Sequence, residues 1–150
     1  MILNSRDELE SQDQGPSLNP AKPKILLLDD DKFYCVLFER YNRKIADIEY
    51  TTNLKAFFKL LRNEEFDLLI IDYDLRSTTC IDILEPIHRI IKTPVAVISS
   101  STSHLDYCQH SNPPLEGVMS YISKWEEPET ILKKALLDRY SKKHKAVMHS

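Results

Sequence analysis

The sequence predicts an α/β fold, a doubly wound five-stranded parallel sheet with helices on both faces. Three short apolar runs end abruptly in an acidic or hydroxyl residue, and segments with apolar residues at helical spacing follow them. Continuous apolar runs of this length are typical of strands that are buried on both faces. Strands that alternate with helices favour parallel pairing through right-handed crossovers, which gives three layers.

The apolar runs place the best-marked strands. Each run and the polar residue after it are residues 25–28 (ILLL) before Asp29, residues 68–71 (LLII) before Asp72, and residues 95–98 (VAVI) before Ser99. Two further strands are expected over residues 48–51 and 118–123. The predicted order is therefore a strand followed by a helix, repeated five times.

Residues at helical spacing mark four of the five helices. In chain order, the four sets are Phe33, Val36, Leu37 and Tyr41; Leu54, Phe57, Phe58 and Leu61; Leu84, Ile87, His88 and Ile91; and Ile131, Leu132, Ala135 and Leu136. Asn53 is suited to be the N-cap of the second helix, and Pro128 to be the first residue of the last helix. Pro86 lies within the third helix, where we expect it to kink or shorten the helix.

The fourth helix is poorly marked. Residues 100–116 are rich in serine, contain a Pro-Pro pair, and offer only Leu105, Tyr107 and Cys108 as apolar anchors. We therefore expect a short or irregular helix at this place.

Composition excludes several classes of function. The chain has 150 residues, enough for one domain, and its net charge of −3 argues against nucleic-acid or membrane-surface binding by charge alone. It has only two glycines, which excludes a glycine-rich phosphate loop. Three cysteines without a pattern do not form a disulfide framework, and the acidic N-terminus is unlike a signal peptide. We therefore expect a cytoplasmic protein.

The polar N-terminus and the basic C-terminus bound the expected domain. Residues 1–22 are polar and end in a proline-rich stretch, so we interpret them as a flexible leader. The folded domain is expected over residues 23–140, and residues 141–150 form a basic tail.

Polar side chains follow four of the predicted strands: Asp29, Asp30, Asp72, Ser99 and Lys124. The carboxyl ends of parallel strands border the binding crevice of such sheets. Three carboxylates in one crevice repel one another unless a cation is present, and Mg²⁺ prefers such oxygen ligands. Asp72 can then act as a nucleophile toward a phosphoryl donor. Lys124 can stabilise the developing charge, and Ser99 can hydrogen-bond a product oxygen.

Four segments carry a family resemblance. Residues 24–31 (KILLLDDD), 67–72 (DLLIID), 93–100 (TPVAVISS) and 121–124 (YISK) each hold a strand with its functional residue. With these segments, the chain over residues 23–140 resembles the receiver domain of two-component response regulators, which has a flavodoxin-like fold. Because little chain follows Tyr140, a stand-alone, single-domain member is expected.

The resemblance implies a mechanism. A histidine kinase or phosphotransfer protein supplies a phosphoryl group to Asp72, and Asp29, Asp30, Asp72 and the backbone carbonyl of Asp74 hold Mg²⁺. Ser99 and the aromatic Tyr121 act as the switch pair, which changes the surface of the fourth helix, fifth strand and fifth helix, where a downstream protein binds. The chain is then a signalling phosphoprotein and not an enzyme, with at most slow self-dephosphorylation.

The sequence departs from the family pattern at three places. Arg76 stands where a proline is usual, Thr79 and Cys80 replace an Asp-Gly pair, and Trp125 replaces the proline that follows the lysine. Family members often make that Lys-Pro bond cis. A cis bond to a residue other than proline costs about 3 kcal/mol, so we expect Lys124–Trp125 to be trans.

These departures leave two alternatives open. The first is a degenerate receiver, a protein-interaction module that is never phosphorylated. The second is a phosphatase of the haloacid-dehalogenase type, because Asp72-Tyr-Asp74 resembles its DxD motif. Such enzymes carry that motif on their first strand, whereas here Asp29 and Asp30 come first.

Overall fold

The computed structural model describes residues 21–149, with side chains as far as residue 141. Most of the predicted leader therefore lies outside the described residues. Five strands form one sheet: β1 (Lys24–Leu28), β2 (Asp47–Thr51), β3 (Leu68–Asp72), β4 (Val95–Ser99) and β5 (Val118–Ser123). Their order is β2-β1-β3-β4-β5 and every neighbouring pair is parallel, as the sequence predicts.

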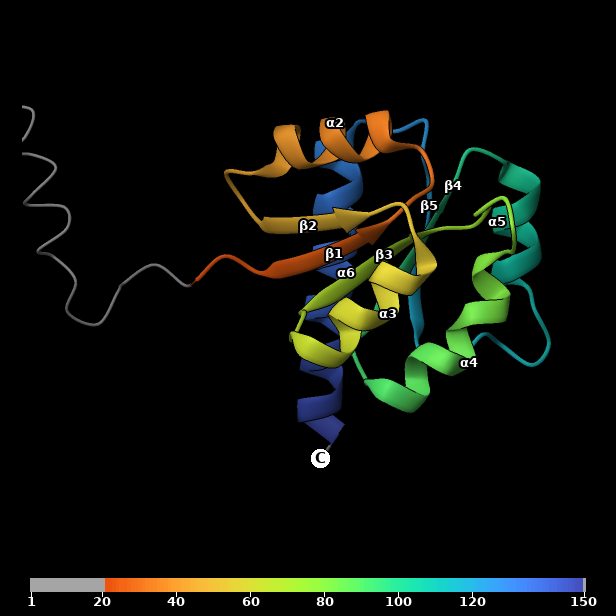
Figure 1. The fold of residues 1–150 in the computed structure, drawn as a ribbon. Coiled ribbons are helices and arrows are strands. Elements are labelled where there is room, and N and C mark those ends of the chain that lie inside the picture. Colours follow the sequence, from red (N-terminus) through yellow and green to blue (C-terminus); the bar gives the residue numbers. More distant parts are fainter. Residues whose placement is uncertain (1–20, 150) are drawn as a thin grey trace, which may run out of the picture.

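Five helices of the described chain connect and cover these strands: α2 (Lys32–Asn42), α3 (Leu54–Asn63), α4 (Cys80–Ile90), α5 (Thr102–Gln109) and α6 (Pro128–His149). Helices α2 and α6 lie on one face of the sheet, and α3, α4 and α5 lie on the other (Figure 1). The fold is therefore the predicted three-layer sandwich. Helix α6 continues beyond residue 140, so the backbone of the predicted basic tail is helical as far as His149.

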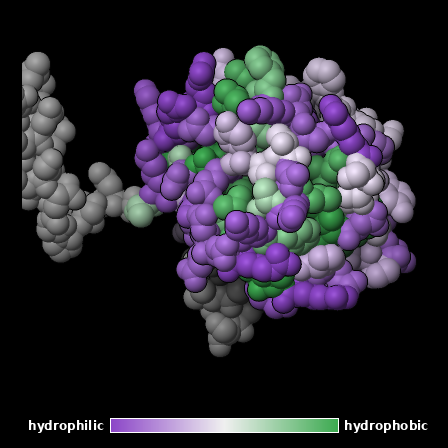
Figure 2. Space-filling view, in the orientation of Figure 1, coloured by the Kyte–Doolittle hydropathy of each residue, from purple (hydrophilic) through white to green (hydrophobic). Residues whose placement is uncertain are grey.

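The two faces of the sheet each bury a hydrophobic core. Leu26, Leu28, Leu69 and Ile71 face α3 and α4, while the alternating residues Ile25, Leu27, Leu68 and Ile70 face α2 and α6. Because successive strand residues point to opposite faces, a strand that is apolar throughout contributes to both cores. Figure 2 shows the side of α3 and α4, where hydrophobic residues appear among a mostly hydrophilic surface.

Side-chain caps fix where several helices begin. The side chain of Asn53 accepts a hydrogen bond from the N–H of Ala56 at 2.9 Å, which confirms its predicted role at α3. Asp31 caps α2 in the same way, and Ser101 caps α5 by accepting from the N–H of His104. Helix α6 begins at Pro128, as predicted.

The buried face of α2 differs from the predicted one. Cys35, Phe38 and Asn42 are buried, whereas Phe33 is 72% exposed and Tyr41 is 57% exposed. The start of the helix at Asp31 sets which residues face the sheet, and the spacing of Cys35, Phe38 and Asn42 fits that face. The apolar character of Phe33 and Tyr41 misled the prediction.

Helices α4 and α5 partly follow the predictions. Helix α4 is not shortened at Pro86 but continues to Ile90. Helix α5 is short, as expected, and buries Leu105 and Cys108, whereas Tyr107 is exposed. In the described chain the cis peptide bond is Asn112–Pro113, so Lys124–Trp125 is trans, as predicted.

Candidate functional site

The predicted acidic residues meet at the carboxyl end of the sheet. Asp29 follows β1 and is fully buried, Asp72 is the last residue of β3 and is buried, and Asp30 is partly exposed. One oxygen from each of these three carboxylates lies within 4.8 Å of the others. Parallel pairing of β1 with β3 brings the ends of these strands side by side, although more than forty residues separate them in sequence.

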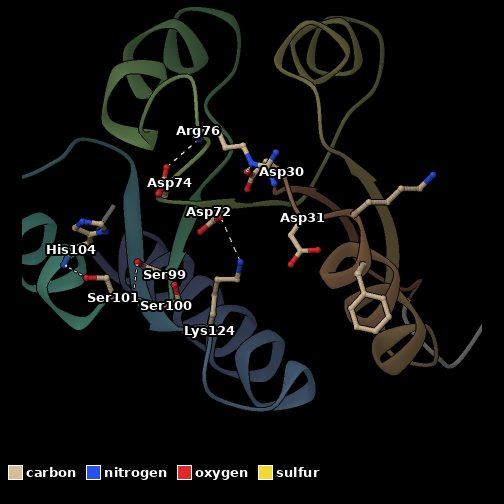
Figure 3. Close-up of a pocket in the computed structure, with 12 residues that line it drawn as sticks. Asp30, Asp31, Asp72, Asp74, Arg76, Ser99, Ser100, Ser101, His104 and Lys124 are labelled. Carbon is tan, nitrogen blue, oxygen red and sulfur yellow. Dashed lines mark hydrogen bonds and ion pairs between the residues drawn. The ribbon is translucent and has the colours of Figure 1, made fainter.

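Lys124 lies beside two of these acids. Its Nζ lies 2.8 Å from Oδ2 of Asp29 and 3.5 Å from Oδ2 of Asp72. The backbone N–H of Lys124 donates to the carbonyl of Ser99 at 2.9 Å, which holds the lysine beside the end of β4. Figure 3 shows the ammonium pointing toward the Asp72 carboxylate. The lysine therefore neutralises part of the charge of two buried acids.

Ser99 and Asp74 line the same pocket, which has a volume of about 690 Å³. Ser99 is buried at the end of β4, and its Oγ accepts a hydrogen bond from the N–H of Ser101 at 3.0 Å. Asp74 lies on the loop after β3, and its side chain accepts from the N–H of Arg76. The structure thus brings Ser99 and Asp74 to the acids, as the sequence predicts.

Tyr121 takes a different position from the other predicted residues. It lies on β5, opposite Val97 of β4, and is half-buried against the core that α4 and α5 cover. It is not among the residues that line the pocket. Burial raises the pKa of its hydroxyl. Tyr121 therefore lies outside the pocket, on the sheet face that α4 and α5 cover.

Burial and mutual repulsion govern the charge of the pocket. Burial, reinforced by the charge of Asp29, raises the pKa of Asp72 to about 7, although Lys124 opposes the shift. Burial also raises the pKa of Asp29, against its hydrogen bond to Lys124. Burial alone lowers the pKa of Lys124, but its hydrogen bond to Asp29 and the charge of Asp72 outweigh that effect and raise it. The pocket therefore has more negative charge than Lys124 can neutralise.

The donor set suits a hard divalent cation. Asp29, Asp30 and Asp72 offer carboxylate oxygens, which are the ligands that Mg²⁺ prefers, and the pocket leaves room for water and a phosphate group. Burial is the main cause of the raised pKa of Asp72 and the charge of Asp29 is the next, and a cation among the three acids would offset both. The residues present therefore fit Mg²⁺.

Sequence reasoning missed three contacts of the site. Nε of Arg76 lies 2.5 Å from Oδ2 of Asp30. The ring of Tyr34 lies 4.3 Å from Nζ of Lys124, a cation–π contact. The ring of His104 stacks on Tyr73, the residue after Asp72, with ring centres 4.3 Å apart. Only Arg76 had a signal in the sequence, because it stands where the family usually has proline.

Comparison with known proteins agrees with this geometry. The family model of the response regulator receiver domain matches residues 25–136. The chain belongs to the response regulator receiver family. Receivers are signalling phospho-acceptors of two-component systems and not classical enzymes, so the haloacid-dehalogenase alternative loses its basis. Receivers also bind Mg²⁺ at an acidic pocket. A comparison with curated protein sequences gave no match.

Solved structures of other receivers share the fold. A CheY-like receiver domain protein from Methanospirillum hungatei JF-1 has a TM-score of 0.68 at 19% identity, with 83% of this chain and 99% of that chain covered. The signal receiver domain of a putative LuxO repressor protein from Vibrio parahaemolyticus has a TM-score of 0.68 at 18% identity, with 87% and 99% covered.

A third similar structure carries a modified residue. It is a response regulator protein from Burkholderia pseudomallei with a phosphorylated aspartic acid, a calcium ion and citrate. Its TM-score is 0.65 at 16% identity, with 86% of this receiver and 75% of that chain covered.

No helix within residues 21–149 of the receiver combines the length and the apolar character that crossing a membrane requires.

Proposed function

We propose that this receiver is a phosphorylation switch in which Asp72 accepts a phosphoryl group. A histidine kinase or a phosphotransfer protein supplies the group from a phosphohistidine. Asp29, Asp30, Asp72 and the backbone carbonyl of Asp74 hold the Mg²⁺. The single observation that carries the proposal is the meeting of Asp29, Asp30 and Lys124 around the buried Asp72 carboxylate.

The transfer follows from the positions of these groups. A carboxylate oxygen of Asp72 forms a bond to phosphorus while the bond from phosphorus to the histidine nitrogen breaks, and the imidazole keeps the electron pair. Nζ of Lys124, 3.5 Å from Asp72, stabilises the charge that spreads onto the phosphoryl oxygens. When bound, Mg²⁺ supplies further neutralisation of that charge.

The switch acts through Ser99 and Tyr121. Ser99 Oγ is buried beside the acceptor and can turn from the N–H of Ser101 to a phosphoryl oxygen. Since Ser101 is also the cap of α5, this exchange connects the pocket to the start of that helix. Tyr121, half-buried on β5, then moves inward, and the α5–β5–α6 face presents a changed surface to a downstream protein.

We place the receiver unit at residues 23–140, between an N-terminal leader of residues 1–22 and a basic tail of residues 141–150. We place the protein in the cytoplasm, because Cys35, Cys80 and Cys108 are all free thiols, as a reducing compartment keeps them. Nucleic acid and membrane are not among its expected partners. Any self-dephosphorylation is slow.

Intact mass measurement after incubation with a small phosphodonor tests the proposal. With acetyl phosphate and Mg²⁺, we expect the wild type to gain one phosphoryl mass, and we expect no gain with a chelator or in Asp72→Asn. Asp74→Asn, which changes another acid that lines the pocket, should retain the gain because only its backbone carbonyl is required.

A wild type without any mass gain would favour the degenerate receiver. The observation that favours this second candidate is the ion pair that Arg76 makes with Asp30, since it occupies a proposed metal ligand. The chain would then act as a phosphorylation-independent interaction module.

A further inference from the structure

Arg76 adopts a backbone conformation that the family's usual residue cannot adopt. Its φ of 66° lies in the left-handed region, whereas proline is fixed near −65°. Its N–H donates to Oδ1 of Asp74 at 3.1 Å, and proline has no N–H to donate. The replacement of proline by arginine therefore permits a different turn after β3.

This turn aims the arginine at the acids of the pocket. Nε of Arg76 reaches Oδ2 of Asp30 at 2.5 Å, and Figure 3 shows the side chain extending from the loop to Asp30. Lys124 contacts the other two acids, Asp29 and Asp72. Two protein cations thus divide three carboxylates between them.

The side chains of Lys124 and Arg76 differ in how easily they can move out of the pocket. The side chain of Lys124 is only 15% exposed and is held between Asp29 and the ring of Tyr34. The side chain of Arg76 is 83% exposed and can turn into water without breaking any packing. Arg76 is therefore the cation that can be displaced from the pocket.

We propose that Arg76 is a tethered cation that competes with Mg²⁺ for Asp30 and so sets the Mg²⁺ affinity of this receiver. The inference rests on the proposed function, in which Asp30 is a metal ligand. Mg²⁺ can use Asp30 only in the molecules in which Asp30 is not paired with Arg76. The apparent Mg²⁺ affinity is therefore the intrinsic affinity multiplied by the unpaired fraction. An exposed ion pair of this kind lowers the fraction of molecules with an unpaired Asp30 about twofold to fivefold.

Mg²⁺ titrations of matched variants by isothermal calorimetry test the inference. Arg76→Gln keeps the length and polarity of the side chain but removes its charge. We expect it to lower the Mg²⁺ dissociation constant about twofold to fivefold, and Arg76→Lys to stay closer to the wild type. Arg89→Gln is the control, because Arg89 is also exposed, pairs with Glu85 on α4 and carries the same charge.

The outcomes separate the inference from the proposed function. If the wild type binds Mg²⁺ and Arg76→Gln binds it equally or more weakly, the competition is wrong while the metal site stands. An equal gain of Mg²⁺ affinity in Arg89→Gln would show a general effect of net charge and would also overturn the proposed competition. If neither the wild type nor Arg76→Gln binds Mg²⁺, the metal site itself fails, and the proposed function with it.

Discussion

At the residue scale, the position of Asp72 at the end of β3 destabilises its ionised carboxylate. It is buried beside Asp29, and Lys124 offsets part of the repulsion between the acids. A carboxylate that is destabilised in this way is stabilised by any positive charge placed beside it. The same arrangement makes the metal-free protein sensitive to pH.

The first prediction concerns the stability of the metal-free protein. Because the pKa of Asp72 is raised to about 7 in the folded state, the protonated form is favoured by folding. The stability that this group contributes is present below its ordinary pKa and is lost as pH rises through about 7. In a chelating buffer at pH 8, Asp72→Asn should therefore be more stable than the wild type, by at most about 4 kcal/mol.

Urea denaturation between pH 4 and pH 8 measures this difference. We expect it to shrink toward zero at the acidic end, where Asp72 is protonated in the wild type. Asp74→Asn is the control, because Asp74 is exposed and its change should have little effect. A gap between Asp72→Asn and the wild type that does not depend on pH would contradict the charge argument.

The residues of the site divide by what a sequence can reveal about them. Asp29, Asp30, Asp72, Ser99 and Lys124 could be predicted because each lies at the end of a strand or just after it, and parallel strands bring their ends to one edge. The contacts of Arg76 and Tyr34 could not be predicted. They depend on a left-handed φ and on the direction of side chains from α2, and neither has a pattern in the sequence.

At the scale of the elements, the strands were easier to predict than the helices. A continuous apolar run predicts a strand in a sheet that is covered on both faces. The bounds of β5 are also the predicted ones. The face of α2 was harder to predict, because Phe33 and Tyr41 are apolar and exposed. Helix α5 was recognised as short, but its cap at Ser101 was not recognised within a serine-rich segment.

The second prediction concerns Pro86 in α4. The helix continues through this residue, although proline has no N–H for the carbonyl of Asp82 one turn earlier. Pro86 is exposed, so its replacement removes no core contact. Pro86→Ala restores the missing hydrogen bond, and we expect it to stabilise the protein by about 1–3 kcal/mol.

Chemical denaturation compares Pro86→Ala with Lys59→Ala, an exposed substitution within α3 that changes no backbone donor. The control should lie within about 0.5 kcal/mol of the wild type. Equal or lower stability of Pro86→Ala would mean that α4 is already adapted to the proline.

At the scale of the whole molecule, the fold explains why distant residues act together. Asp29 and Lys124 are 95 residues apart in sequence, yet they form a hydrogen bond at the carboxyl edge of the sheet. The order β2-β1-β3-β4-β5 places β3 in the centre, so Asp72 has the end of β1 on one side and that of β4 on the other. The fold thus fixes the neighbours of Asp72 on both sides.

The central claim is that Asp72 is the phosphorylated residue. Acetyl phosphate and Mg²⁺ are added to the wild type, the acyl phosphate is reduced with borohydride, and the modified residue is located by tandem mass spectrometry of peptides. We predict that the modification lies on Asp72 and that it is absent when a chelator replaces Mg²⁺. Modification at Asp29, Asp30 or Asp74 with Asp72 unmodified would contradict the claim.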